Sequence, residues 1–191
     1  MRLYSCLLAA VLFGAMSRGQ TVDIYTQFEH RASNLSLENM KVELQEIMKP
    51  AGLNLEWHSL QEATGKGEAS QILVVHFEGE CASDQLETAT VKTGPLGWTS
   101  VSDGEVLPFS YVDCDQIRHL MITSLSAVVP GEREYLLGRA MARVLAHEMY
   151  HVFTNSTQHS SQGIGKAVYS STELVSRRLV FEPRLHTRWF R

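Results

Sequence analysis

The chain has 191 residues, 44% of them hydrophobic, and its formal net charge at pH 7 is −4. This length and apolar content exclude an intrinsically disordered chain and favour a single globular domain with a sizeable core. The 17 basic residues are outnumbered by 21 acidic ones, so we expect no basic face for nucleic acid.

The first 19 residues have the composition of a secretory signal peptide. Arg2 supplies a positive charge, an apolar run extends over 3–16, and the small residues Ser17 and Gly19 fit a cleavage site. The run is too short to cross a bilayer comfortably, although an uncleaved membrane anchor is the alternative. We therefore predict a signal peptide over 1–19 and a secreted or periplasmic protein without stable membrane insertion.

Cysteine usage agrees with export. Cys6 lies in the predicted signal peptide, which leaves Cys81 and Cys114 as an even number in an oxidising compartment. We predict one disulfide between them. Two separate buried thiols are the alternative, because the sequence does not show that the two backbones come close enough to bridge.

The first half of the predicted domain, which extends over 20–191, combines strands with one helix. Alternating or buried apolar patterns predict strands at 21–28, 53–60 and 71–79. After Ser36, a plausible N-cap, apolar residues recur at helical spacing until Pro50 and Gly52 end the helix.

Two extended runs then flank Asp103-Gly104, a dipeptide favoured in tight hairpin turns. Pro108 in the second run has no N–H to donate, so its strand should lie at a sheet edge or carry a bulge. An exposed edge near a pocket could pair with an extended peptide. A short helix is expected over 114–125.

The longest helical pattern, over 132–153, carries two histidines and a glutamate on one side. At about 100° per residue, His151 lies about 40° and Glu148 about 100° from His147, so all three point into one arc. Two imidazoles one turn apart can hold Zn²⁺, and the glutamate beside them can reach a zinc-activated water without binding the metal. This division of roles predicts hydrolysis of an amide bond with Glu148 as general base.

Through the stretch His147-Glu148-Met149-Tyr150-His151 the sequence resembles the zincin metallopeptidases. The order of a mixed sheet, an early helix and a late helix carrying the motif also resembles the zincin fold, in particular its metzincin branch. The resemblance implies an α+β fold with a mixed twisted sheet and a long active-site helix, a bound Zn²⁺, and an edge strand that aligns a peptide or protein substrate. The chain is also similar to secreted bacterial zincin-like proteins.

The chain departs from the metzincin pattern after the motif. Metzincins have a glycine three residues and a third histidine six residues after the second histidine. Here Thr154 stands at the first of these positions, and His159 follows His151 by eight residues. No methionine follows Met149, so the methionine turn of that branch is missing.

Two residues compete as the third zinc ligand. His159 follows the helix, and Asn155 can adopt the left-handed conformation that turns the chain back toward the metal. Glu173 is the alternative, because gluzincins take their third ligand from a glutamate on a later helix. However, Glu173 also fits a capping box with Ser170. We favour His159.

Other candidate residues have ordinary explanations. Tyr169 could donate a hydrogen bond to a reaction intermediate, but a packing tyrosine is the favoured interpretation. The tail over 184–191 is basic and aromatic, and we expect it to pack on the domain. The remaining histidines are expected at the surface or satisfied in the core: His30, His58, His76, His119 and His186.

Two functions follow from these residues. The first is an exported zinc metallopeptidase that hydrolyses peptide bonds. The second is a non-catalytic zinc-binding domain that uses the same ligands for structure or partner binding. Glu148 favours the first, because a structural site closes with a fourth protein ligand and needs no carboxylate that does not bind metal.

Overall fold

The computed structural model describes residues 20–30, 32–63, 71–84 and 93–179. The predicted signal peptide over 1–19 and the tail over 184–191 lie outside these residues. The strands are β1 Gln20–Phe28, β2 Leu53–Ser59, β3 Gln71–Glu78, β4 Gly97–Ser102 and β5 Glu105–Asp113. The helices are α1 Asn34–Met48, α2 Cys114–Leu120, α3 Ile122–Ser126, α4 Pro130–Thr154 and α5 Ser171–Val175.

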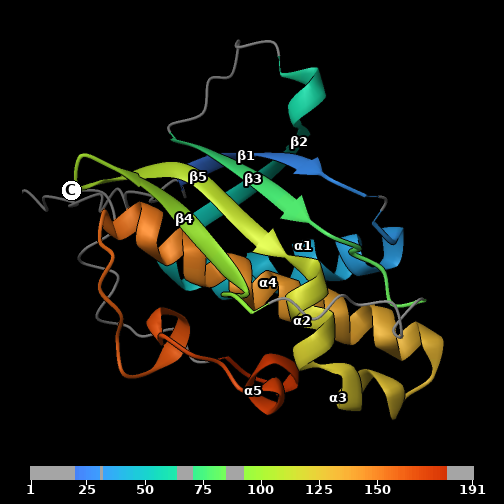
Figure 1. Ribbon diagram of the computed structural model, residues 1–191. Helices are drawn as coiled ribbons and strands as arrows, with labels where there is room; N and C mark the ends of the chain where they lie inside the picture. The colour runs from blue at the N-terminus through green and yellow to red at the C-terminus, as the bar shows by residue number, and fades with distance from the viewer. Residues whose placement is uncertain (1–19, 31, 64–70, 85–92, 180–191) are drawn as a thin grey trace, which may run out of the picture.

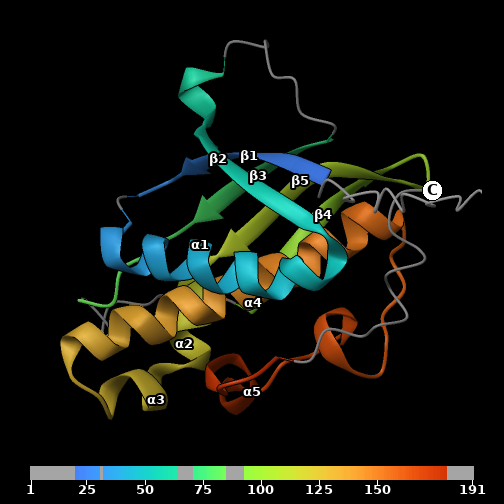
Figure 2. The same ribbon diagram turned by 180° about the vertical axis from the view of Figure 1, so that it is seen from behind.

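The five strands form one mixed sheet in the order β2-β1-β3-β5-β4. β4 is antiparallel to β5, whereas the other neighbours are parallel. Helices α1 and α4 lie side by side across one face of this sheet, and the smaller helices lie beyond α4 (Figures 1 and 2). The architecture is therefore the α+β arrangement with a mixed sheet that the sequence predicts.

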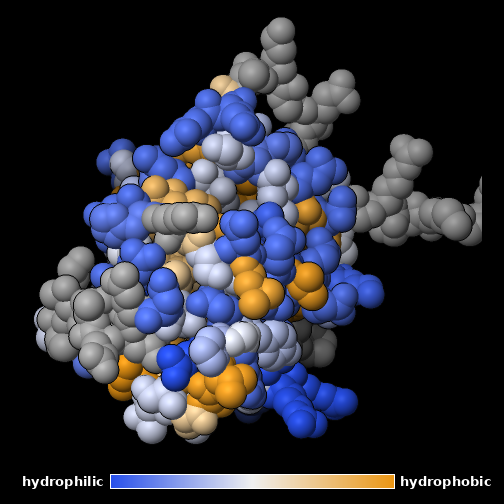
Figure 3. Space-filling view, turned by 90° about the vertical axis from the view of Figure 1, so that its right-hand side faces the viewer, coloured by the Kyte–Doolittle hydropathy of each residue, from blue (hydrophilic) through white to orange (hydrophobic). Residues whose placement is uncertain are grey.

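The core lies between the sheet and these two helices. Strand residues such as Val22, Ile24 and Leu73 are fully buried there, and α1 contributes Met40 and Leu44. Hydrophilic side chains dominate the face shown in Figure 3, interrupted by a few separate apolar patches. No helix within the described residues has both the length and the apolar character needed to cross a membrane.

Helix α1 begins three residues earlier than the sequence indicates. The N-cap is Ser33, whose hydroxyl accepts from the backbone N–H of Ser36. The prediction that Ser36 is the N-cap is wrong, because its side chain is fully buried and donates to the backbone carbonyl of Glu134 in α4 at 3.1 Å. The predicted end is confirmed: a short 3₁₀ turn containing Pro50 leads into Gly52 in the left-handed conformation, at φ 73°.

The predicted hairpin at Asp103-Gly104 joins β4 to β5. Both residues have positive φ, 53° and 85°, as a tight type I′ turn requires. Of the two alternatives for Pro108, the edge position is wrong, because β5 lies between β3 and β4. The bulge is confirmed: the β4/β5 register shifts between Thr99 and Val101, opposite the segment that contains Pro108.

A disulfide joins Cys81, after β3, to Cys114 at the start of α2. Both cysteines are fully buried, and their Cα atoms are 5.1 Å apart. The predicted pairing is therefore confirmed. The helix expected over 114–125 is instead two short helices, α2 and α3, with Met121 between them.

Helices α1 and α4 approach closely at Gly138. A Cβ at this position would lie 2.9 Å from Cβ of Asn39 and 3.1 Å from the backbone nitrogen of Met40, and would overlap the carbonyl oxygen of Ser36. The contacts are mainly with backbone or a Cβ atom, which a rotamer change does not relieve. This glycine therefore sets the separation of the two helices that cover the sheet.

We expect Gly138→Ala to lower the free energy of unfolding by roughly 1–3 kcal/mol, because overpacking outweighs the better helix propensity of alanine. Gly131 in the same helix is the matched control, because no atom lies within 4 Å of a Cβ built there. Gly131→Ala should be neutral or slightly stabilising. Urea unfolding of both variants measures the difference, and equal stabilities would contradict this account of the packing.

Candidate metal centre

The site is built on the buried C-terminal half of α4. His147, Glu148 and His151 are only 8%, 3% and 7% exposed, because this part of the helix packs between the sheet and the segments that follow it. The helix ends at Asn155, in the left-handed conformation at φ 44°. The side-chain oxygen of Asn155 accepts from the backbone N–H of Val106 at 3.0 Å, which ties the helix end to the hairpin.

Backbone carbonyls orient the two imidazoles of α4. Nδ1 of His147 lies 2.7 Å from the oxygen of Ile164, and Nδ1 of His151 lies 2.6 Å from the oxygen of Ser156. A carbonyl oxygen only accepts, so each Nδ1 carries the hydrogen. In the neutral imidazoles the two Nε2 atoms therefore present bare lone pairs, and these atoms are only 3.1 Å apart.

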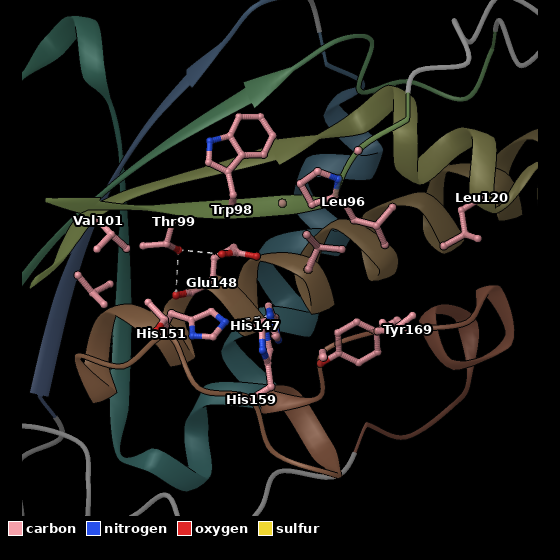
Figure 4. Close-up of a pocket in the computed structure, with 18 residues that line it drawn as sticks. Leu96, Trp98, Thr99, Val101, Leu120, His147, Glu148, His151, His159 and Tyr169 are labelled. Carbon is pink, nitrogen blue, oxygen red and sulfur yellow. Dashed lines mark hydrogen bonds between the residues drawn. The ribbon is translucent and has the colours of Figure 1, made fainter. Parts of the chain in front are cut away.

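The chain turns back after Asn155 and brings His159 to the same place. The ring of His159 is nearly parallel to that of His147, with centroids 5.2 Å apart, and perpendicular to that of His151, with centroids 4.9 Å apart. One donor atom from each histidine lies within 4.8 Å of the others. Figure 4 shows the three rings gathered beneath β4.

Glu173, the alternative third ligand, is not part of this cluster. Its carboxylate accepts from the backbone N–H of Ser170 at 2.8 Å, and the hydroxyl of Ser170 in turn accepts from the backbone N–H of Glu173. The predicted capping box is therefore present at the start of α5. A second interaction pairs Glu173 with Lys166.

The donor set fits a zinc ion. Two unprotonated imidazole nitrogens that face each other at 3.1 Å repel unless a cation lies between them. Tetrahedral zinc with bonds of about 2.1 Å places two nitrogen ligands about 3.4 Å apart, close to the separation in this structure. The hydrogen bonds from each Nδ1 to a carbonyl are the second-shell contacts that fix metal-ligating histidines.

Burial keeps these imidazoles neutral. Desolvation lowers the pKa of His147 to about 4, although the hydrogen bond to Ile164 acts in the opposite direction. The pKa of His151 is also lowered, mainly by burial. At neutral pH both rings can therefore bind a metal without first losing a proton.

Burial has the opposite effect on the pKa of Glu148. Burial raises its pKa to about 7, and a hydrogen bond from Thr99 lowers it in part. The hydroxyl of Thr99 donates to Oε2 of Glu148 at 2.8 Å. A carboxyl group with a pKa near neutrality can both accept and release a proton at physiological pH.

A cavity of about 600 Å³ opens beside these groups, between α4 and the edge strand β4. Apolar side chains such as Val101, Leu120 and Val168 line much of it. Gly97 allows β4 to approach the helix, because a Cβ there would lie 2.7 Å from Val144 Cγ1 and 3.1 Å from Oε1 of Glu148. The site is thus an open cleft beneath a sheet edge.

Tyr169 lines the cleft, but its hydroxyl donates to the carbonyl oxygen of Ile164 at 2.8 Å. The same oxygen accepts from His147, so Tyr169 supports a histidine through a shared carbonyl. Thr99 and Ile164 are absent from the residues that the sequence singles out. A hydroxyl on an edge strand and a backbone carbonyl carry no sequence signal of their own.

No protein-family model matches the chain, and no curated protein sequence matches it significantly. Among solved structures the chain resembles archaemetzincin from Methanopyrus kandleri, with a TM-score of 0.52 and 14% sequence identity. The match covers 90% of this chain and 94% of that one. This likeness shows the fold alone: the α+β architecture with its mixed sheet matches that of the archaemetzincin.

The buried carboxyl group makes a testable contribution to stability in metal-free protein. The pKa of Glu148 is about 7 in the folded state, above its value in the unfolded chain. Between about pH 4.5 and 7 the folded state therefore binds more protons, and stability falls as the pH rises. We expect metal-free Glu148→Gln to be more stable than metal-free wild type at pH 8, by up to roughly 3 kcal/mol.

Urea unfolding with a chelator present, at pH 4.5 and pH 8, measures this difference. The lowered pKa of His147 affects both proteins alike and cancels in the comparison. Glu132→Gln, at the exposed start of the same helix, is the control and should show no such dependence. A stability difference that stays constant between the two pH values would contradict the assigned ionisation of Glu148.

Proposed function

We propose that the protein is an exported zinc-dependent metallopeptidase that hydrolyses peptide bonds in peptides or proteins. The observation that carries the proposal is the convergence of three imidazoles, His147, His151 and His159, beside the buried carboxyl group of Glu148 in an open cleft. The zincin-like fold and the buried disulfide support it. Export by a signal peptide over 1–19 is part of the proposal.

In this proposal the three histidines hold Zn²⁺. When bound, zinc supplies a Lewis acid that polarises a substrate carbonyl and activates water for attack. His147 and His151 are held for this role by the carbonyls of Ile164 and Ser156. His159 would complete a set of three protein ligands beside the open cleft, the number that catalytic zinc sites use.

Glu148 moves the proton. Thr99 holds Oε2, and Oε1 is the oxygen left to accept a proton from the attacking water and deliver it to the leaving amine. Thr99 lies on β4, which among the described strands pairs with β5 only and forms one edge of the sheet. A peptide that pairs with this edge lies along the cleft, next to the carboxyl group that Thr99 orients.

We expect wild-type protein to bind about one zinc per chain at this site, and His147→Ala, His151→Ala and His159→Ala each to bind it much more weakly, because each loses one of three ligands. Glu173→Gln is the matched control, since its carboxylate is engaged by Ser170 and Lys166. Zinc affinities of all four variants decide the ligand set. Loss of zinc in Glu173→Gln with retention in His159→Ala would make the site gluzincin-like.

We expect Glu148→Gln to keep its zinc and to lose peptide hydrolysis by roughly 10²–10⁴-fold in kcat/KM, because proton transfer is removed while the ligands stay. Cleavage of a broad peptide library by zinc-loaded protein is the measurement, and Glu132→Gln should cleave like wild type. If zinc-loaded wild type cuts no peptide in the library, the non-catalytic zinc-binding domain replaces the enzyme.

A further inference from the structure

Helices α1 and α4 cover one face of the sheet (Figures 1 and 2), and a second group of potential metal ligands lies on the opposite face. Val22 and Ile24 of β1 point into the core, so Asp23 between them points to the opposite face. The register of β1 and β2 pairs Asp23 with Glu56, and His58 follows two residues later on the same face. One donor atom from each of these three residues lies within 4.8 Å of the others.

The burial of Asp23 distinguishes this group from an ordinary surface ion pair. Asp23 is only 5% exposed, yet within the described ranges no lysine or arginine pairs with it. Among the described residues, its one polar contact joins Oδ1 to Nε2 of His58, at 3.2 Å. A carboxylate this buried relies on compensating charge or hydrogen bonds, and His58 is the partner that the described residues supply.

Glu56 adds a second negative charge without adding a cation. Its carboxylate is exposed and makes no hydrogen bond or ion pair with any residue in the described part of the chain. It is paired with Asp23 on the neighbouring parallel strand, and because their donor oxygens lie within 4.8 Å of each other the two negative charges repel. A divalent cation between the two carboxylates would remove this repulsion.

The strand backbone and a neighbouring ring hold His58 in place. Its imidazole stacks on Tyr25 of β1, with centroids 5.0 Å apart and planes 28° apart. The hydroxyl of Thr26 donates to the carbonyl of His58 at 3.2 Å. The imidazole of His58 is thus oriented toward Asp23, and the exposed side chain of Glu56 can close the set.

We propose that Asp23, Glu56 and His58 form a second zinc site, separate from the cleft and independent of peptidase activity. One imidazole nitrogen and two carboxylate oxygens are ligands that zinc accepts, and three protein donors leave room for water. The ligands come from adjacent strands of the sheet, so the site would also tie β2, at the edge, to β1.

Calorimetric titration of the full chain with ZnCl₂, starting from protein that already holds one equivalent, tests the proposal. Wild type should take up a second equivalent. His58→Ala and Asp23→Asn should each weaken that second equivalent by more than ~100-fold, and Glu56→Gln should weaken it less, because its side chain is exposed. The first equivalent and the far-ultraviolet circular dichroism should be unchanged.

His76→Ala is the matched control. His76 is a half-buried histidine on the same sheet, stacked on Tyr111 as His58 is stacked on Tyr25, but it belongs to no group of metal ligands in the described residues. It should keep both equivalents. The proposal is overturned if wild type takes up no second equivalent, or if His76→Ala loses it as His58→Ala does. Because Glu56→Gln alters only an exposed group, retention of full second-site affinity in that variant would also remove Glu56 from the site.

Discussion

Helix α4 runs through the core, and each polar side chain that it buries needs a partner from another segment. An unsatisfied buried polar group costs about 1–3 kcal/mol, so these partners are strongly constrained. Four contacts meet the requirement: Arg143 with Glu43, Glu148 with Thr99, His147 with Ile164, and His151 with Ser156. They connect α4 to α1, to the edge strand β4 and to the segment after the helix. The same contacts that allow α4 to be buried therefore assemble the walls of the cleft around the histidines.

Local sequence patterns explain why much of the histidine cluster and its surroundings can be predicted from the sequence. The four-residue spacing of His147 and His151 sets their relative direction on any α-helix, and Asn155 supplies the left-handed residue that ends the helix. The two additional residues before His159, relative to the metzincin pattern, are taken up in the polar turn. The capping box likewise explains Glu173 from four consecutive residues. Each of these features depends on neighbours in the chain, which is why sequence alone predicts them.

Features that depend on segments distant in the sequence cannot be predicted in this way. Ser36 has the chemistry of an N-cap, but the packing of α1 on α4 uses its hydroxyl for Glu134, and Ser33 caps the helix instead. Pro108 is compatible with a strand interior only because the β4/β5 register shifts beside it. Thr99 reaches Glu148 because the order of the strands brings β4 over the part of α4 that carries Glu148. His58 resembles a scattered surface histidine until the pairing of β1 with β2 brings it to Asp23.

The burial of Glu148 bears most directly on the choice between an enzyme and an inert zinc-binding domain. A structural zinc site gains from a fourth protein ligand, whereas the cleft cluster among the described residues contains three histidines and not this carboxylate. Burial raises the pKa of Glu148 to about 7, which means that its ionised form destabilises the folded state. A domain with no chemistry to perform would be more stable with an uncharged residue at this position. Glu148 is a destabilising group that Thr99 holds in place beside three converging imidazoles, at an open cleft. Catalytic sites commonly carry such a local loss of stability.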